Sequence, residues 1–338
     1  MSQPSESATD PARRSQLLAV KLASLVREHT GGDSVELGTF PGGAALVRDG
    51  HDAWVLLEER PERGLGPALA WARQQGAAHL HVIAEQATGI LARRAAEFAE
   101  PPTVWEVSGR SLSIADPEAP PPVAVIDPEL LDFAAVIERS GATPVVDHGV
   151  LVGEVFGLEV CRAVRDETTG AARLDVGVGA HDREAFQLMH GDAPIESSLA
   201  RVVAAVAEHR RPGADPHALN RLGAERALRA RLIADPALVG LTDIAVADPP
   251  VPRMNLKDPV PCVAVGLRED GGRAVVVCSV GIDLDLVPFA ADARLALLGG
   301  DPDAELLIAV PERDAHAVTK ALAAALCRPA VIVPVPPR

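Results

Sequence analysis

The spacing of apolar residues along the chain predicts an alternation of helices and strands. Leu18, Leu22 and Leu25 recur at helical spacing, which predicts an amphipathic helix over residues 13–29 that ends at Gly31-Gly32. Short apolar runs bounded by turn residues predict strands. The first 116 residues therefore have the expected order α-β-β-β-α-β-α-β, with helices at 13–29, 65–75 and 90–98 and strands at 34–40, 44–48, 53–58, 79–84 and 104–107.

A proline-rich segment, Pro117 to Pro122, separates this region from the rest of the chain. Such a composition favours an extended linker over a helix or a strand. We therefore predict four parts: a disordered tail at 1–12, an α/β domain at 13–116, a linker at 117–126, and a second α/β region at 127–338 that is divided near residue 212.

Similar patterns recur in the second region. Its helices are expected at 128–139, from 182, and at 195–211, 217–233, 289–298 and 315–326, and its strands at 150–156, 158–164, 172–178, 262–267, 274–282, 305–310 and 330–335. The hairpin over 158–179 resembles the hairpin over 262–281, and residues 44–58 have the same outline. Either the chain contains an internal duplication, or these are ordinary half-buried hairpins. The predicted fold class is α/β with an α+β tendency, built from two mixed-sheet domains of α-β-β-β-α-β type.

The charge of the chain limits its partners. The 338 residues carry a net charge of −15, and lysine occurs only at Lys21, Lys257 and Lys320. This acidity disfavours binding to nucleic acid or to an anionic membrane surface. No apolar run approaches the roughly 20 residues that cross a bilayer, and the polar start shows no secretory signal. We expect a cytoplasmic protein with no membrane contact and a composition typical of high-GC bacteria. A protein partner and a homo-oligomer both stay open.

The four cysteines do not form a recognisable metal site. Cys161, Cys262, Cys278 and Cys327 are far apart, without a CxxC pair, so we predict reduced thiols that are mostly buried. The chain also lacks the GxGxxG, GxxxxGK[ST], GxSxG and HExxH signatures.

The densest group of titratable residues lies in the second region. Glu159 and Asp175 fall on two successive predicted strands, a spacing that suits hairpin partners and a divalent-metal pair. His181 and Asp182 follow where a strand leads into a helix. These four residues are the candidate catalytic residues, with Glu159, Asp175 and Asp182 as candidate ligands of Mg²⁺ or Mn²⁺. The alternative is that Asp182 caps the helix and that His181 is exposed.

A second candidate surface is basic. Arg221, Arg226 and Arg229 fall on one predicted helix and form a candidate phosphate- or partner-binding stripe, with a solvated helix face as the alternative. Lys257 lies in a proline-flanked loop, where a charge has no packing role, so we add it to the candidate contacts.

The element order of the first region and the segment His79 to Leu112 resemble the restriction-endonuclease-like PD-(D/E)XK superfamily, and Mrr-type domains in particular. The resemblance covers about a hundred residues. It implies two carboxylates that hold a divalent metal, beside a lysine that stabilises charge. Glu58-x-Arg60 stands where the second half of that motif is expected. The preceding strand has no acid and the matching strand has no lysine, so the resemblance implies a degenerate site.

Two functions remain. The first is a nuclease-like, nucleic-acid-associated protein with a degenerate or residual divalent-metal site. The alternative is a non-catalytic scaffold or protein-interaction protein that retains the fold without a working site. The sequence leaves open whether the protein is an enzyme.

Overall fold

The structure is a computed structural model that describes residues 11–31, 35–190, 194–211, 213–215, 217–251 and 260–337. Its fold is mixed α/β, as predicted. The chain forms two compact units: unit 1 combines residues 1–119 with 284–292 and 317–329, and unit 2 combines 120–283 with 293–316 and 330–338. Most of the predicted tail, residues 1–10, lies outside the described residues.

Unit 1 is built on a six-stranded sheet in which the strands follow one another in chain order. The first three strands are antiparallel, β3, β4 and β5 are parallel, and β6 returns antiparallel. The expected α-β-β-β-α-β-α-β order is confirmed, with β6 as an additional strand. The strands are β1 (Val35–Gly38), β2 (Gly43–Arg48), β3 (Asp52–Leu57), β4 (His79–Ala84), β5 (Thr103–Ser108) and β6 (Ser111–Ile114).

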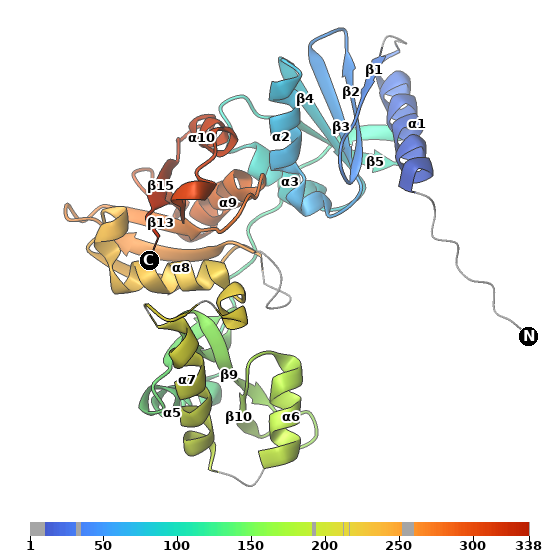
Figure 1. The fold of residues 1–338 in the computed structure, drawn as a ribbon. Coiled ribbons are helices and arrows are strands. Elements are labelled where there is room, and N and C mark those ends of the chain that lie inside the picture. Colours follow the sequence, from blue (N-terminus) through green and yellow to red (C-terminus); the bar gives the residue numbers. More distant parts are fainter. Residues whose placement is uncertain are drawn as a thin grey trace, which may run out of the picture. The chain divides into compact units, whose positions relative to one another are not determined.

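Helices cover both faces of this sheet (Figure 1). Helix α1 (Pro11–Thr30) lies on one face, where Leu22 and Val26 of its apolar stripe join the core with strand residues such as Leu46. The two parallel connections carry α2 (Leu65–Gln74) and α3 (Thr88–Ala95) on the other face. Parallel neighbours need such crossover connections, because a tight turn can only reverse the chain.

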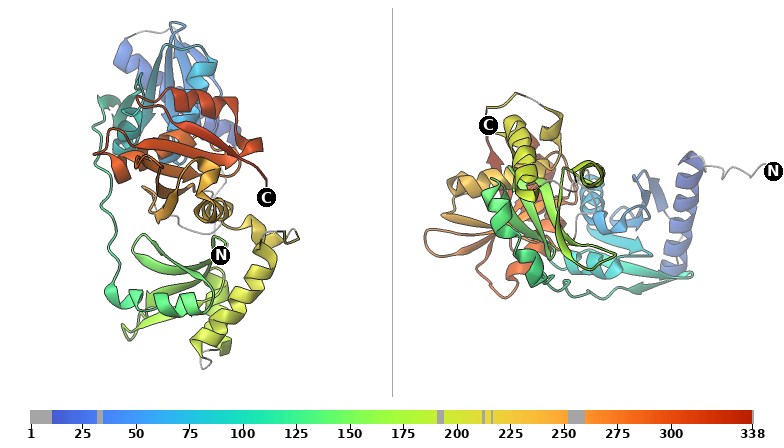
Figure 2. Two further views of the ribbon diagram at one scale, coloured as in Figure 1. Left: turned by 90° about the vertical axis from the view of Figure 1, so that its left-hand side faces the viewer. Right: turned by 90° about the horizontal axis from the view of Figure 1, so that it is seen from below.

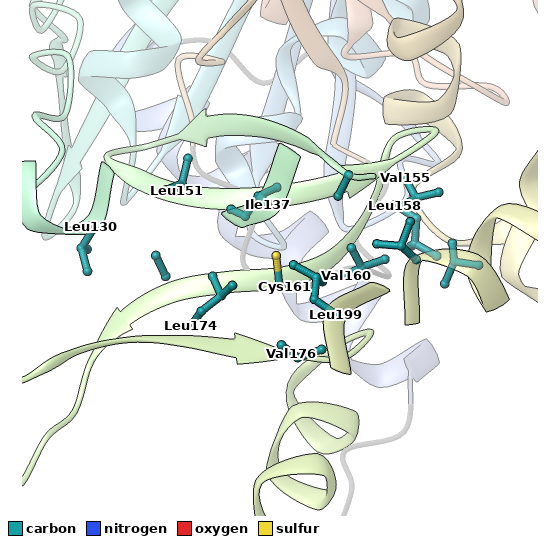
Figure 3. Packing of buried hydrophobic residues seen from close by; sticks show 14 residues of the cluster. Leu130, Ile137, Leu151, Val155, Leu158, Val160, Cys161, Leu174, Val176 and Leu199 are labelled. Carbon is teal, nitrogen blue, oxygen red and sulfur yellow. The ribbon is translucent and has the colours of Figure 1, made fainter. Parts of the chain in front are cut away.

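Unit 2 contains an antiparallel four-stranded sheet in the order β10-β9-β8-β7. Strand β7 was not predicted, and the predicted helix at 128–139 is two short helices, α4 (Pro128–Leu131) and α5 (Ala134–Arg139). Helices α5 and α7 (Ile195–Arg210) pack beside the sheet (Figure 2), over the apolar cluster shown in Figure 3. The strands are β7 (Thr143–Asp147), β8 (Val150–Val155), β9 (Leu158–Arg165) and β10 (Ala172–Val176), and α6 (Ala180–His190) follows β10.

The third sheet has five strands and repeats the topology of unit 1. Strands β11, β12 and β13 are antiparallel, and β13, β14 and β15 are parallel, as in β1 to β5. Each hairpin has six residue pairs, from Gly43 with Leu57 to Arg48 with Asp52 in the first, and from Cys262 with Cys278 to Leu267 with Arg273 in the other. The strands are β11 (Asp243–Ala247), β12 (Cys262–Leu267), β13 (Arg273–Cys278), β14 (Glu305–Pro311) and β15 (Val331–Val335).

The structure therefore relates the hairpin over 262–281 to residues 44–58. The hairpin over 158–179, which the sequence comparison also matched, belongs to a sheet whose strands are all antiparallel. The helices agree as well: α8 (Ala224–Ala234), α9 (Leu286–Leu298) and α10 (Ala317–Ala324) take the places of α1, α2 and α3 in the order of elements. This correspondence favours the internal duplication over the alternative of unrelated hairpins.

Two late segments of the chain complete unit 1. Phe98, after α3, forms an antiparallel bridge with Leu326, after α10. The amide of Gly66 in α2 donates to the Asp285 carboxylate at 3.0 Å. All four cysteines are reduced, as predicted, and three of them are buried, with Cys327 exposed. None of the helices in the described ranges is both long and apolar enough to cross a membrane.

Candidate functional site

Glu159 lies at an irregularity in β9 that turns it away from the apolar core. Glu154 pairs with Glu159 and Gly153 pairs with Cys161, so β9 contains one extra residue, Val160, at this point. Val160 and Cys161 both join the core of the sheet. The extra residue shifts the alternation of side chains, so that Glu159 and Arg162 share the opposite face.

Arginine side chains bind the carboxylate of Glu159. The side chain is only 2% exposed. Arg162 donates to it through Nε at 2.9 Å and Nη2 at 3.0 Å, and Arg183 donates through Nη1 at 3.0 Å. Arg226 approaches to 3.7 Å. A cation at Glu159 would have to displace these guanidinium groups and would lie among their positive charges.

Asp175 does not lie directly opposite Glu159 in the hairpin of β9 and β10. Asp175 of β10 lies opposite Arg162, three residues along β9 from Glu159. Arg162, which pairs with Asp175 across the ladder, donates to the Glu159 carboxylate at 2.9 Å. Asp175 is 3.0 Å from Arg173 Nε instead. The expectation that the two acids are direct hairpin partners is wrong, because sequence separation does not define register in an irregular hairpin, whereas a shared metal stays a prediction.

The positions of Asp182 and His181 agree with the alternative in which Asp182 caps the helix and His181 is exposed. Asp182 lies in the first turn of α6, and its carboxylate accepts the amide hydrogen of Val178 at 2.8 Å. His181 is fully exposed, 3.9 Å from Glu184. Asp182 stabilises the start of a helix, and the expectation that these residues join the strand acids around a metal stays a prediction.

Two of the three arginines of the predicted basic stripe are neither solvated nor free for phosphate. Arg226 and Arg229 are each about 5% exposed. Arg226 binds Asp147 and also Glu154, at 3.2 Å, and Arg229 binds Glu154 at 3.3 Å. Arg221 lies outside α8, in a separate 3₁₀ turn, Ala218–Arg221, where it is exposed. Lys257 lies outside the described residues.

Helix α8 explains this burial, because its two faces meet different surroundings. Leu228 and Leu232 belong to the core of the five-stranded sheet, whereas Arg226 and Arg229 bind the carboxylates of β8. The turn from β8 to β9 also reaches α8 closely. A Cβ at Gly157 would lie 2.3 Å from the carbonyl of Arg226. Buried arginines with carboxylate partners form a structural layer of unit 2.

A different group in unit 2 has the composition of a metal site. Asp147, His148 and Asp248 place one ligand atom each within 4.8 Å of one another. His148 and Gly149 form the tight turn between β7 and β8, where both have positive φ angles. Asp248 directly follows β11. Two carboxylates and an imidazole are donors for divalent cations, so this group, which the sequence analysis missed, could hold a metal ion.

The same three side chains already have partners. His148 Nδ1 lies 2.8 Å from Asp147 Oδ1, and its Nε2 lies 3.1 Å from the carbonyl of Pro249. The hydrogen bond with Asp147 raises the pKa of His148. Burial alone would raise the pKa of Asp147, but the hydrogen bond to His148 and the charge of Arg226 outweigh it and lower that pKa to about 2. A metal ligand at His148 would need the imidazole to lose a proton.

In unit 1, a lysine from helix α1 lies close to the end of β3, a strand that has no lysine of its own. Glu58 follows β3 and Glu85 follows β4, and Lys21 of α1 lies 3.6 Å from the first carboxylate and 2.7 Å from the second. Arg60, the second residue of the Glu58-x-Arg60 segment, lies 3.8 Å from Glu62. The carboxyl ends of parallel strands are common positions for polar groups in α/β proteins. Helix α1 contributes the ammonium group to this edge.

Comparison with known proteins adds no relative to these observations. No family model matches the chain, and neither the curated proteins nor the solved structures contain a match. The assignment of function therefore depends on the geometry alone.

Proposed function

We propose that the protein is a non-catalytic interaction protein that retains a duplicated α/β frame without a working hydrolytic site. One observation supports this proposal most strongly: the carboxylate of Glu159, the best ligand candidate in the sequence, is buried against Arg162 and Arg183, with Arg226 at 3.7 Å. A metal-dependent nuclease needs open carboxylates that share a cation. We keep as a proposal that the first region resembles the restriction-endonuclease-like superfamily and carries a degenerate form of its motif.

Calorimetric titration of the full chain with Mg²⁺ and Mn²⁺, followed by a DNA-cleavage assay, tests this function. We expect no cleavage with either metal, both for the unmodified chain and for Asp175→Ala, because Asp175 is already paired with Arg173. Metal-dependent cleavage that Asp175→Ala abolishes would contradict the proposal. Glu184→Ala is the matched control, since Glu184 is exposed and lies outside the buried layer.

A second candidate function is a divalent-metal site at Asp147, His148 and Asp248, which the proximity of their ligand atoms favours. A mixed imidazole and carboxylate set suits Mn²⁺ better than Mg²⁺, which prefers oxygen ligands. This candidate predicts saturable Mn²⁺ binding that is lost in Asp248→Ala and that weakens below neutral pH, where His148 holds its proton. Binding that survives Asp248→Ala would exclude this site.

A nuclease activity at this metal site would require nucleic acid as the substrate. The net charge of −15 opposes such binding, because the phosphate backbone attracts basic surfaces. A protein partner fits the acidic surface without this penalty. We therefore place an interaction function ahead of a residual nuclease function.

A further inference from the structure

Unit 2 contains a pocket of about 550 Å³ that the assignments above do not use. This volume lies within the range of pockets that hold small organic molecules. Three segments form most of its wall: the proline-rich linker, the end of β7 with the turn that follows it, and the end of β11. Its apolar lining includes Pro121, Pro122, Val146, Val246, Ala247 and Leu297.

Four prolines line this pocket and restrict the backbone of its wall. Pro121 and Pro122 stand on one side, and Pro249 and Pro250 stand on another. The proline ring fixes φ, so these segments lose little conformational freedom when a ligand binds. A wall that is already ordered favours binding of an apolar group, because little entropy is lost on association.

The polar part of the wall is acidic. The pocket is lined by His148 and Asp248 and by no lysine or arginine among the described residues. The ring of His148 is held by Asp147, whose Oδ1 lies 2.8 Å from Nδ1. Within the described part of the chain, the carboxylate of Asp248 accepts one hydrogen bond, from the backbone amide of His148 to Oδ1 at 2.9 Å. Among the described residues no group donates to its other oxygen, Oδ2, so a charged acceptor lines the pocket beside apolar side chains.

From this arrangement we propose that the pocket binds a small organic cation: an amine with an apolar body, whose ammonium group pairs with Asp248 while its hydrocarbon part lies against the prolines and valines. The net charge of −15 favours the approach of a cation and disfavours that of an anion. This inference deepens the proposed function, because an interaction protein needs a binding site. It requires no metal, so its test is separate from the cleavage assay.

Isothermal titration of the full chain at pH 7 with n-octylamine, which is then an ammonium ion, tests the proposal. The matched probes n-octanol and n-octanoate have the same hydrocarbon chain with no charge and with a negative charge. We expect one octylammonium per chain, with octanol and octanoate each bound at least about tenfold more weakly. All probes are used well below the concentrations at which they form micelles. Equal binding of octanol would overturn the assignment of a cation.

Two variants locate the site. Asp248→Asn keeps an oxygen to accept the His148 amide and removes the charge, so it should weaken octylammonium binding roughly tenfold and leave octanol binding unchanged. Ala296→Trp, on the partly exposed part of α9 that lines the pocket, should abolish binding of both probes by filling the space. Leu17→Trp, on the exposed face of α1, is the control for a new tryptophan.

Three results would overturn the proposal. These are octylammonium binding that Ala296→Trp leaves intact, binding unaffected by Asp248→Asn, and the absence of binding by the unmodified chain. Circular dichroism confirms that each variant is folded. If Ala296→Trp does not fold, Val146→Phe fills the same pocket from the end of β7 and takes its place in the test.

Discussion

Units 1 and 2 each bury arginines against carboxylates, but the two clusters differ in how far they are closed. In unit 1, Asp292 is fully buried and binds both Arg93 and Arg94, and Arg94 also binds Asp285. In unit 2, the layer around Glu159 and Glu154 continues to Asp147 and His148, which are partly exposed. A closed cluster has a structural role only, whereas an open end beside a pocket leaves a charge for a ligand.

The position of each cluster in the chain also differs. Asp285 and Asp292 come from a segment almost 200 residues after Arg93 and Arg94. The unit 1 cluster therefore joins the N-terminal sheet to its late segments. The unit 2 cluster joins two neighbouring sheets through α8. Both clusters consist of buried ion pairs. The stability of each unit is therefore very sensitive to the loss of one partner.

The largest effect is expected for Asp292→Ala, which removes the fully buried carboxylate that Arg93 and Arg94 share. The free energy of unfolding of unit 1 should fall by about 3–5 kcal/mol. All three tryptophans, Trp54, Trp71 and Trp105, belong to unit 1, so urea denaturation followed by fluorescence reports this unit directly. Asp116→Ala, at an exposed position, is the control. A loss below about 1 kcal/mol would show that the unit 1 cluster is not closed.

A smaller loss, about 2–3 kcal/mol in the same assay, is expected for Gly66→Ala. A Cβ at this position would lie 1.9 Å from the carbonyl oxygen of Leu284 and would push the late segment away from α2. Gln74→Ala, at an exposed position of the same helix, is the control. If both variants were equally stable, the close contact between α2 and the late segment would be absent in solution.

Acid should affect the stability of the two units differently. The free energy of unfolding of unit 1 should fall by about 1–2 kcal/mol. Burial lowers the pKa of His81 from its ordinary 6.5 to about 4. Between these values the unfolded chain binds the proton and folded unit 1 does not, so unit 1 loses stability as pH falls from about 6.5 to 4. The pKa of His148 in unit 2 is raised, so its contribution is fully present at low pH and is lost only as pH rises.

Fluorescence-detected urea denaturation at several pH values measures this loss. His81→Phe, which retains a ring against Trp54, should remove most of the pH dependence of unit 1. The exposed His181→Ala should leave it unchanged. A pH dependence that persists in His81→Phe would assign the effect to other groups.

The smallest effect, about 1 kcal/mol, is expected for Arg183→Gln in unit 2, because Glu159 keeps its two hydrogen bonds from Arg162. Hydrogen exchange of peptides from β9 measures this change. The exposed Arg139→Gln is the control. A loss as large as that of Asp292→Ala would show that the arginines around Glu159 do not substitute for one another.

Local patterns were enough to predict most of the fold. The hairpin of β12 and β13, strand β4 and the helix after β3 follow from apolar spacing and turn residues, because these signals act within a few residues. Strands β7 and β11 were missed, and with them Asp147 and Asp248. The turn Asp147-His148-Gly149 was the available signal, since histidine, like asparagine and aspartate, is enriched at positive φ.

The candidate site could not be predicted from such patterns. Glu159 and Asp175 have a suitable spacing, but the extra residue in β9 and the arginines from α6 and α8 determine what surrounds each carboxylate. Arg226 has the spacing of a solvated helix face, yet it is buried because carboxylates of β7 and β8 cover it. Partners that lie 70 or more residues apart leave no local signal.

The most direct test of the central claim is hydrogen exchange across unit 2, with and without millimolar Mn²⁺, for the unmodified chain and Glu159→Gln. If Glu159 is a partner of arginines, Glu159→Gln speeds exchange in β9 and α8 to the same extent with and without the metal, and Mn²⁺ does not protect β9 or β10 in the unmodified chain. Protection of β9 and β10 by Mn²⁺ that disappears in Glu159→Gln would contradict this account and would restore the metal pair.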